Sequence, residues 1–157
     1  MRKISIPLLG LLFSSLSVSA QPKQKIVTKQ DTQPLKTILI GCGLPFKIVN
    51  DSLAVIPYGG ENIPSFQVFI QKASDLYIIY TNLSESLPGK IDETTFKYLL
   101  QRNDHFDIVK LCLGTDNLVY VRADVYRSSV NTLLLSRIIR QVANVTNIIG
   151  GDVAAAK

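Results

Sequence analysis

Three pairs of strand-like apolar stretches, each joined by a short polar link, are the feature that most constrains the fold of this chain. The links are Asn50-Asp51-Ser52, Lys72–Asp75 and Gly114–Asn117. Links of three or four residues between alternating apolar runs are of hairpin length, so each pair predicts two antiparallel strands. The six strands are expected at residues 46–49, 53–58, 66–71, 76–81, 108–113 and 118–123. The strand over 76–81 is apolar on both faces, which favours an inner strand covered on both sides or covered by a partner molecule.

Helical periodicity marks the segment before the first strand. Its apolar residues follow i, i+3, i+4, i+7 spacing, which defines one face of a helix: Leu35, Ile38, Leu39 and Cys42. Asp31 or Thr32 is expected to cap this helix, with Pro34 in its first turn. Gly41 and Gly43 are expected to end it.

Two further helices are predicted later in the chain. Asp92 is a natural N-cap for a helix that ends near Asn103. Ser128 or Ser129 is expected to cap a long final helix that ends at Gly150-Gly151. Its predicted buried stripe consists of Leu134, Ile138, Val142, Val145 and Ile149.

The resulting order is α-β-β-β-β-α-β-β-α, which predicts an α+β domain with helices packed against an antiparallel sheet. The predicted boundaries are a single domain over residues 31–150, a flexible polar segment over 21–30 and a flexible tail over 151–157. One domain is what a chain of 157 residues is expected to form.

The first twenty residues have the three regions of an export signal. Arg2 and Lys3 precede an apolar stretch over residues 4–16, and Val18 and Ala20 supply the small side chains required before a cleavage site. The sequence therefore predicts a signal peptide over residues 1–20, cleavage between Ala20 and Gln21, and a periplasmic or secreted product. The apolar stretch is shorter than the roughly 20 residues of a spanning helix, so no stable membrane span is expected.

The charge of the mature chain argues against nucleic acid as a partner. The whole chain has 17 basic and 12 acidic side chains, and removing residues 1–20 leaves 15 basic ones and a net charge of +3. This excess is modest, and no basic stripe with interleaved aromatic residues accompanies it. A zinc site is not expected either, because one histidine and two cysteines provide too few ligands at any usual spacing. We therefore predict no metal and no cofactor.

Motifs in the second half of the chain permit a comparison with known families. A helix with the Leu99-Leu100 pair is followed by Phe106-Asp107-Ile108-Val109-Lys110, by Val121-Arg122-Ala123-Asp124, and then by a capped long helix. With these motifs, the order of elements from Leu35 to about Asn147 resembles the type III secretion chaperone-like fold, particularly its YbjN-type branch. The resemblance implies a binding or chaperone-like module, often dimeric, and provides no catalytic residues. Secretion chaperones of that family act in the cytosol, and the export signal is this chain's departure from them.

The single histidine and the two cysteines do not form an expected site. His105 and Cys112 are seven residues apart, so along an extended strand their side chains would point to opposite faces, which argues against a Cys–His catalytic pair. A disulfide between Cys42 and Cys112 is the minor expectation for an exported chain. Two separately buried thiols are the main one, because Cys42 lies on the apolar helical face and Cys112 faces away from the apolar row of its strand.

The candidate partner surface is formed by Lys110, Tyr120 and Arg122, which share a sheet face with Cys112 and Ile108. A face with cationic and aromatic side chains is suited to a protein partner. A solvated sheet exterior, with long side chains lying over apolar neighbours, is the simpler interpretation and the one favoured by the sequence.

The sequence thus favours an exported, non-enzymatic module that binds a protein, which could be a second copy of itself. Two alternatives remain. A small exported enzyme using Asp or Tyr groups would need a deep polar pocket with converging ionisable groups. A cystatin-like inhibitor or ligand-binding domain would have an exposed apolar loop at one end of its sheet.

Overall fold

The structure is a computed structural model that describes residues 34–87 and 91–155. The predicted signal peptide, the cleavage site at Ala20 and Gln21 and the polar segment over 21–30 lie outside the described residues. These three remain predictions. Asp31 and Thr32, the predicted caps of the first helix, also lie outside the described residues, and that prediction is wrong because Pro34 is the N-cap of the helix.

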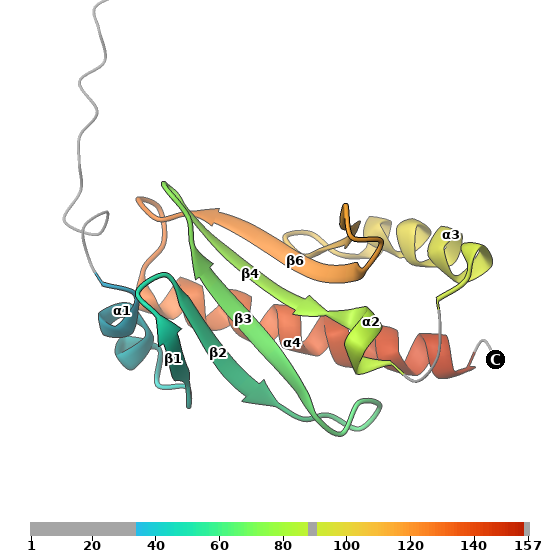
Figure 1. Cartoon of the computed structure of the whole chain (residues 1–157), viewed down its shortest axis with the longest axis horizontal. Coiled ribbons are helices and arrows are strands. Elements are labelled where there is room, and N and C mark those ends of the chain that lie inside the picture. Colours follow the sequence, from blue (N-terminus) through green and yellow to red (C-terminus); the bar gives the residue numbers. More distant parts are fainter. Residues whose placement is uncertain (1–33, 88–90, 156–157) are drawn as a thin grey trace, which may run out of the picture.

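Six antiparallel strands form one sheet in the order β1-β2-β3-β4-β6-β5. The first four strands are a meander. The chain then leaves the sheet through helical segments and returns as β5 at the edge, and β6 inserts between β5 and β4 (Figure 1). The strands are β1 (Lys47–Asn50), β2 (Leu53–Tyr58), β3 (Phe66–Lys72), β4 (Leu76–Asn82), β5 (Lys110–Leu113) and β6 (Val119–Tyr126). The predicted hairpins are present.

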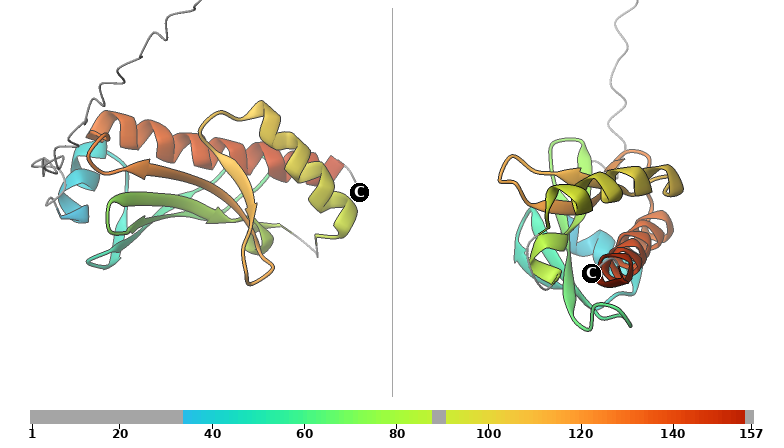
Figure 2. Two further views of the ribbon diagram at one scale, coloured as in Figure 1. Left: turned by 90° about the horizontal axis from the view of Figure 1, so that it is seen from above. Right: turned by 90° about the vertical axis from the view of Figure 1, so that its right-hand side faces the viewer.

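Helices cover one face of the sheet. The long helix α4 crosses this face and contacts β3, β4 and β6, while α1 lies beside the first part of α4 and contacts β2 (Figures 1 and 2). Helix α3 packs near β5 at one end of the molecule. The helices are α1 (Leu35–Cys42), α2 (Leu83–Ser86), α3 (Glu93–Gln101) and α4 (Thr132–Ala155), with a 3₁₀ turn η1 (Arg102–His105) after α3. The predicted α+β class and element order are confirmed.

The core lies between the sheet and this helical layer. Alternate residues of the central strands point into it, among them Ile70, Tyr77, Ile79 and Val121, each no more than 1% exposed. Helix α4 contributes its apolar face, and burying such side chains stabilises each by roughly 1.5–3 kcal/mol. Within residues 34–87 and 91–155, no helix has the length and apolar character needed to cross a bilayer.

Helix α1 begins later than predicted. Pro34 is its N-cap residue, with extended backbone at ψ 143°, and not a member of the first turn. The predicted apolar face is confirmed, since Leu35, Ile38, Leu39 and Cys42 are all buried. Gly41 lies within the helix. Gly43 ends it in the left-handed region at φ 65°, where a residue without a Cβ is not strained.

The predicted start of the final helix is wrong. Residues 127–130 are used in the turn from the sheet to the helical layer, in which the Ser129 N–H donates to the Tyr126 carbonyl. Asn131 caps α4 instead of Ser128 or Ser129, because its Oδ1 accepts the Leu134 N–H at 2.8 Å. The predicted stripe is buried except for Leu134, which is only half-buried.

The predicted end of that helix at Gly150-Gly151 is also wrong. Helix α4 continues to Ala155, and Val153 is 5% exposed, so most of the predicted tail over 151–157 is helix. Both glycines lie against the β2–β3 loop, where a Cβ on Gly150 would approach the Ile63 side chain to 2.5 Å. The glycines allow this loop and the helix to approach closely, so tertiary packing explains their presence.

Smaller differences occur around β4 and β5. Helix α2 was not predicted; it has only four residues, too few for a periodic pattern, and is capped by Asn82, whose Oδ1 accepts the Glu85 N–H. The strand expected over 108–113 begins at Lys110, where pairing with Arg122 starts. Ile108 therefore precedes the strand and is 46% exposed.

The Asp92 cap of α3 is confirmed, because its carboxylate accepts the Thr95 N–H at 2.8 Å.

Candidate binding surface

The second face of the sheet has none of the described helices packed across it (Figure 2). Strand registers place one residue from each of the six strands in a single row across this face. In spatial order the row is Lys47, Val55, Phe69, Tyr80, Arg122 and Lys110. The row is apolar or aromatic in the middle and cationic at its ends.

Three aromatic side chains form the centre of this open face. The rings of Phe69 and Tyr80 stack with centroids 5.2 Å apart, and Tyr80 meets Tyr120 edge-on at 5.9 Å. Offset stacks and edge-to-face pairs at these separations are favourable ring geometries. All three side chains are half-buried. The face therefore has an ordered aromatic cluster that is partly accessible to a partner.

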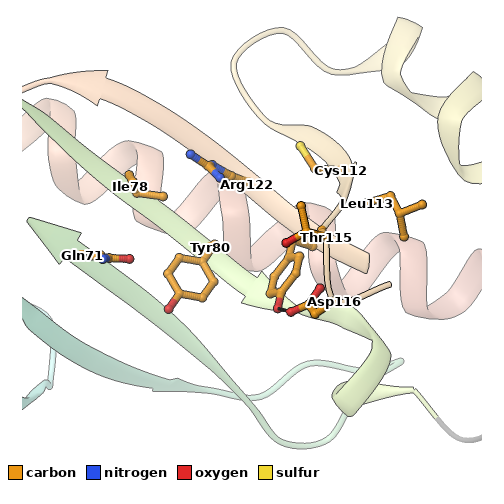
Figure 3. Close-up of a pocket in the computed structure, with 10 residues that line it drawn as sticks. Gln71, Ile78, Tyr80, Cys112, Leu113, Thr115, Asp116 and Arg122 are labelled. Atoms are coloured by element: carbon orange, nitrogen blue, oxygen red, sulfur yellow. Dashed lines mark hydrogen bonds between the residues drawn. The ribbon is translucent and has the colours of Figure 1, made fainter. Parts of the chain in front are cut away.

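A hollow of about 470 Å³ lies beside this cluster. Figure 3 shows Gln71, Ile78 and Tyr80 from β3 and β4 on one side of it. The β5–β6 hairpin forms the other side with Cys112 and Arg122, among others. Tyr120 of β6 also lines the hollow. The hollow is open to solvent and combines apolar groups with a few polar ones.

The β5–β6 turn forms one wall of the hollow and is held by Asp116. Its Oδ1 accepts the Leu118 N–H at 3.1 Å, and its Oδ2 accepts the Tyr120 hydroxyl at 2.6 Å. The bond to Asp116 raises the pKa of Tyr120 to about 12, and the same bond holds the pKa of the Asp116 carboxyl below its usual value. Gly114 leaves room for this pair, because a Cβ there would lie 2.3 Å from Asp116 Oδ1.

Arg122 is bound to a neighbour on its own strand. Its Nε and one terminal nitrogen donate to the two Asp124 carboxylate oxygens at 2.8 and 2.9 Å. This bidentate bond raises the pKa of Arg122 above its usual value. The pair is locally neutral, so Arg122 is not a free cation for an anionic ligand.

The Lys110 side chain forms hydrogen bonds to the backbone of neighbouring residues. Its ammonium donates to the Asn103 carbonyl at 3.2 Å and to the Phe106 carbonyl. Asn103 in turn bonds β5: its Oδ1 accepts the Leu111 N–H at 2.7 Å, and its Nδ2 donates to the Leu111 carbonyl at 3.1 Å. The two Asn103 bonds occupy the N–H and the carbonyl of Leu111 on the edge strand β5. Because these backbone groups are already paired, the addition of another strand at this edge is limited.

The structure thus brings the three predicted surface residues together. Lys110 pairs directly with Arg122 across β5 and β6, and Tyr120 pairs with Cys112 in the same two strands. A role in binding a partner remains a prediction for Lys110, Tyr120 and Arg122. What sequence reasoning missed was the larger surface, in which Phe69 is central. The alternation of Gln67, Phe69 and Gln71 was the available signal, since it marks an aromatic residue on the polar face of its strand.

The histidine and the cysteines do not converge. His105 is exposed on η1 and lines a separate hollow of about 190 Å³ against α4. Both cysteines are free, as the main expectation held, but only Cys42 is buried; Cys112 is partly exposed. Burial raises the pKa of the Cys112 thiol, which disfavours the thiolate. Among the described residues, no three His, Cys, Asp or Glu side chains are grouped to hold a metal ion.

Comparisons with known proteins support the fold. No protein-family model matches the chain, and no curated protein sequence is significantly similar to it. A solved structure is similar: the type III secretion chaperone SpcU in the heterodimeric ExoU–SpcU complex of Pseudomonas aeruginosa. The match has a TM-score of 0.53 at 16% identity and covers 74% of this chain and 95% of that one. This chain therefore has a type III secretion chaperone-like fold.

Proposed function

We propose that this protein is an exported, non-enzymatic module that binds an extended segment of a partner protein on its open sheet face. The observation that carries the proposal is the aromatic cluster of Phe69, Tyr80 and Tyr120, which lies beside an open hollow on the face away from the helices. Aromatic side chains that remain accessible and ordered are the residues that contribute most to protein interfaces. The similar chaperone was solved in complex with a protein, which supports a protein as the ligand class.

The electrostatics of the hollow argue against the alternative of a small enzyme. General acid–base catalysis requires groups whose pKa values lie near the working pH. Here the pKa of Tyr120 is raised to about 12 and that of Asp116 is lowered, so both shifts move away from neutrality. The carboxylate and the hydroxyl bind each other and leave neither group poised for a substrate.

The cystatin-like alternative has less support from the described loops. The β2–β3 loop buries its apolar residue Ile63 against α4, where Asn147 Oδ1 accepts the Ile63 N–H at 3.2 Å. The turns over 51–52, 73–75 and 114–117 consist mainly of polar residues and glycine. An exposed apolar loop of the expected kind is thus not found at these turns.

Site-specific photo-crosslinking in exporting cells tests the proposal. A photo-reactive amino acid in place of Gln71 lies at the hollow, and the matched control replaces Gln141, an exposed residue of α4 on the other side of the sheet. We expect crosslinked polypeptides from position 71 and several-fold fewer from position 141. Mass spectrometry then identifies the partner; peptides of this chain itself would identify a homodimer, which is one form of the proposed partner.

The variant Tyr80→Ser links the crosslinks to the aromatic cluster. Removing the ring takes away both aromatic contacts of this residue, so the yield at position 71 should fall several-fold while the circular dichroism spectrum remains unchanged. Equal crosslinking yields at positions 71 and 141 would contradict the proposal. So would a yield at position 71 that is unchanged in the Tyr80→Ser variant.

A further inference from the structure

Two of the most exposed apolar side chains among the described residues lie on the outer side of the helical layer. Ile40 of α1 is 62% exposed, and Leu133 of α4 is 72% exposed. The two helices touch at the neighbouring residues, because a Cβ on Gly41 would lie 2.6 Å from the Thr132 side chain (Figures 1 and 2). Both apolar side chains therefore project from the same end of the helical layer.

Three cationic side chains share the outward faces of these helices. Lys36 precedes Ile40 by four residues on α1, and Arg137 and Arg140 follow Leu133 by four and seven residues on α4. Residues with these spacings lie on one side of a helix. All three cations are exposed. We call these five residues the basic helix patch.

The two helices provide no acid that would neutralise the patch. Helix α1 contains neither Asp nor Glu, and the one acid of α4 is Asp152, which lies near its C-terminal end and pairs with Arg102 at 2.8 Å. The other ion pair among the described residues is Arg122–Asp124, on the open sheet face. The cations of the patch are thus in no ion pair within the part of the chain that the structure describes.

Apolar side chains next to unpaired cations match the surface of an anionic bilayer. Helices that lie on a membrane bury their apolar residues at the boundary between headgroups and acyl chains, while Lys and Arg contact the anionic headgroups. The fluid headgroup layer needs no matching pocket. A protein interface, in contrast, needs a packed centre from which water is excluded, and two separate apolar side chains do not form one.

We propose that the basic helix patch docks this protein on the surface of an anionic phospholipid bilayer, with Ile40 and Leu133 inserted at the level of the headgroups. The open sheet face lies on the other side of the sheet from α1 and α4, so it stays accessible to a polypeptide while the protein is docked (Figure 2). Docking on lipid goes beyond the proposed function and does not depend on it.

Vesicle sedimentation tests the charges of the patch. The protein as cells produce it should bind vesicles of phosphatidylcholine and phosphatidylglycerol in equal parts several-fold more strongly than vesicles of phosphatidylcholine alone. Arg137→Gln and Arg140→Gln should each weaken binding to the mixed vesicles by about fivefold. The matched control Lys47→Gln removes an exposed cation of β1 and should leave the binding unchanged.

Three results would overturn the proposal. The first is equal binding to the two kinds of vesicle, and the second is equal binding by the unaltered chain and the two arginine variants. The third is binding of polyglutamate, and not of vesicles, that depends on Arg137 and Arg140, because the occupant of the patch would then be an acidic polypeptide.

A tryptophan at position 133 tests the insertion. The sequence contains no tryptophan, so Leu133→Trp places a single fluorescent reporter in the patch, and the control Leu113→Trp places one at an exposed leucine of β5. On the mixed vesicles, the emission of Leu133→Trp should shift to shorter wavelength and be quenched by brominated acyl chains. The emission of Leu113→Trp should do neither. Bound Leu133→Trp with an unshifted, unquenched emission would also overturn the proposal.

Discussion

Single side chains on the open face are bound mainly to each other. Tyr120 donates to Asp116, Arg122 to Asp124, and Lys110 to the backbone of the η1 region. From the sequence alone, each of these charged groups or hydrogen-bond donors would be expected to be available to a partner, but in the structure each is already bound within the protein. The remaining accessible surface at the centre of the face is aromatic, which is why we assign binding to Phe69 and Tyr80.

The Tyr120–Asp116 bond predicts a specific pH dependence. The pKa of Tyr120 in the folded protein, about 12, exceeds the ordinary value near 10, so the bond contributes its full stability below pH 10 and loses it as the pH rises through 12. Asp116→Asn should return the Tyr120 titration toward pH 10, as measured by ring carbon NMR shifts. Asp124→Asn is the control, because it removes a carboxylate of the same face that does not bond Tyr120. An unchanged Tyr120 titration in Asp116→Asn would refute this cause.

At the level of elements, the sequence predicted the start or end of a helix correctly where a residue at that position itself caps or terminates the helix. Asp92 caps α3 through its own side chain, and Gly43 ends α1 with its own left-handed backbone. The final helix differs at both ends, because the chain between Tyr126 and Asn131 forms the turn from sheet to helix, and because Gly150 and Gly151 pack against another element. Neither the turn nor the packing of the glycines can be recognised from a short stretch of neighbouring residues.

The glycines of α4 provide the prediction at this scale. Gly150→Ala gains about 1 kcal/mol of helix propensity. Its new Cβ would lie 2.5 Å from Cγ1 of Ile63, which is 3% exposed and held by the Asn147 bond, so overpacking should cost about 1–3 kcal/mol. We expect a net loss of about 1 kcal/mol in urea unfolding.

Asn144→Ala is the matched control for this prediction, since Asn144 is an exposed residue of the same helix. It should stabilise the protein by a few tenths of a kcal/mol through helix propensity alone. A stabilisation by Gly150→Ala equal to that of Asn144→Ala would mean that the helix–loop contact does not require glycine.

At the scale of the whole molecule, the untested export prediction has a direct measurement. We expect the exported protein to begin at Gln21, as determined by intact mass and N-terminal sequencing. Ala20→Arg should block cleavage, because the peptidase pocket is shallow, whereas Ser19→Leu, at a position that is not held in that pocket, should be processed. A protein recovered from the envelope with residues 1–20 still attached would contradict the prediction.

The sequence by itself determined the α+β class, the three hairpins, the face of α1 and the cap of α3. Each of these follows from interactions between residues that are near in sequence: alternation, turn length, helical spacing and capping. These properties also supported the resemblance to the type III secretion chaperone-like fold.

Only the tertiary structure decided which surface remains accessible. The insertion of β6 between β4 and β5 places Tyr120 beside Tyr80, and the packing of α4 on one face leaves Phe69 and Tyr80 on the other. The same long-range packing extends α4 through Gly150 to Ala155. The physical reason is that strand order and helix docking bring together residues that are distant in sequence, so no local pattern contains them.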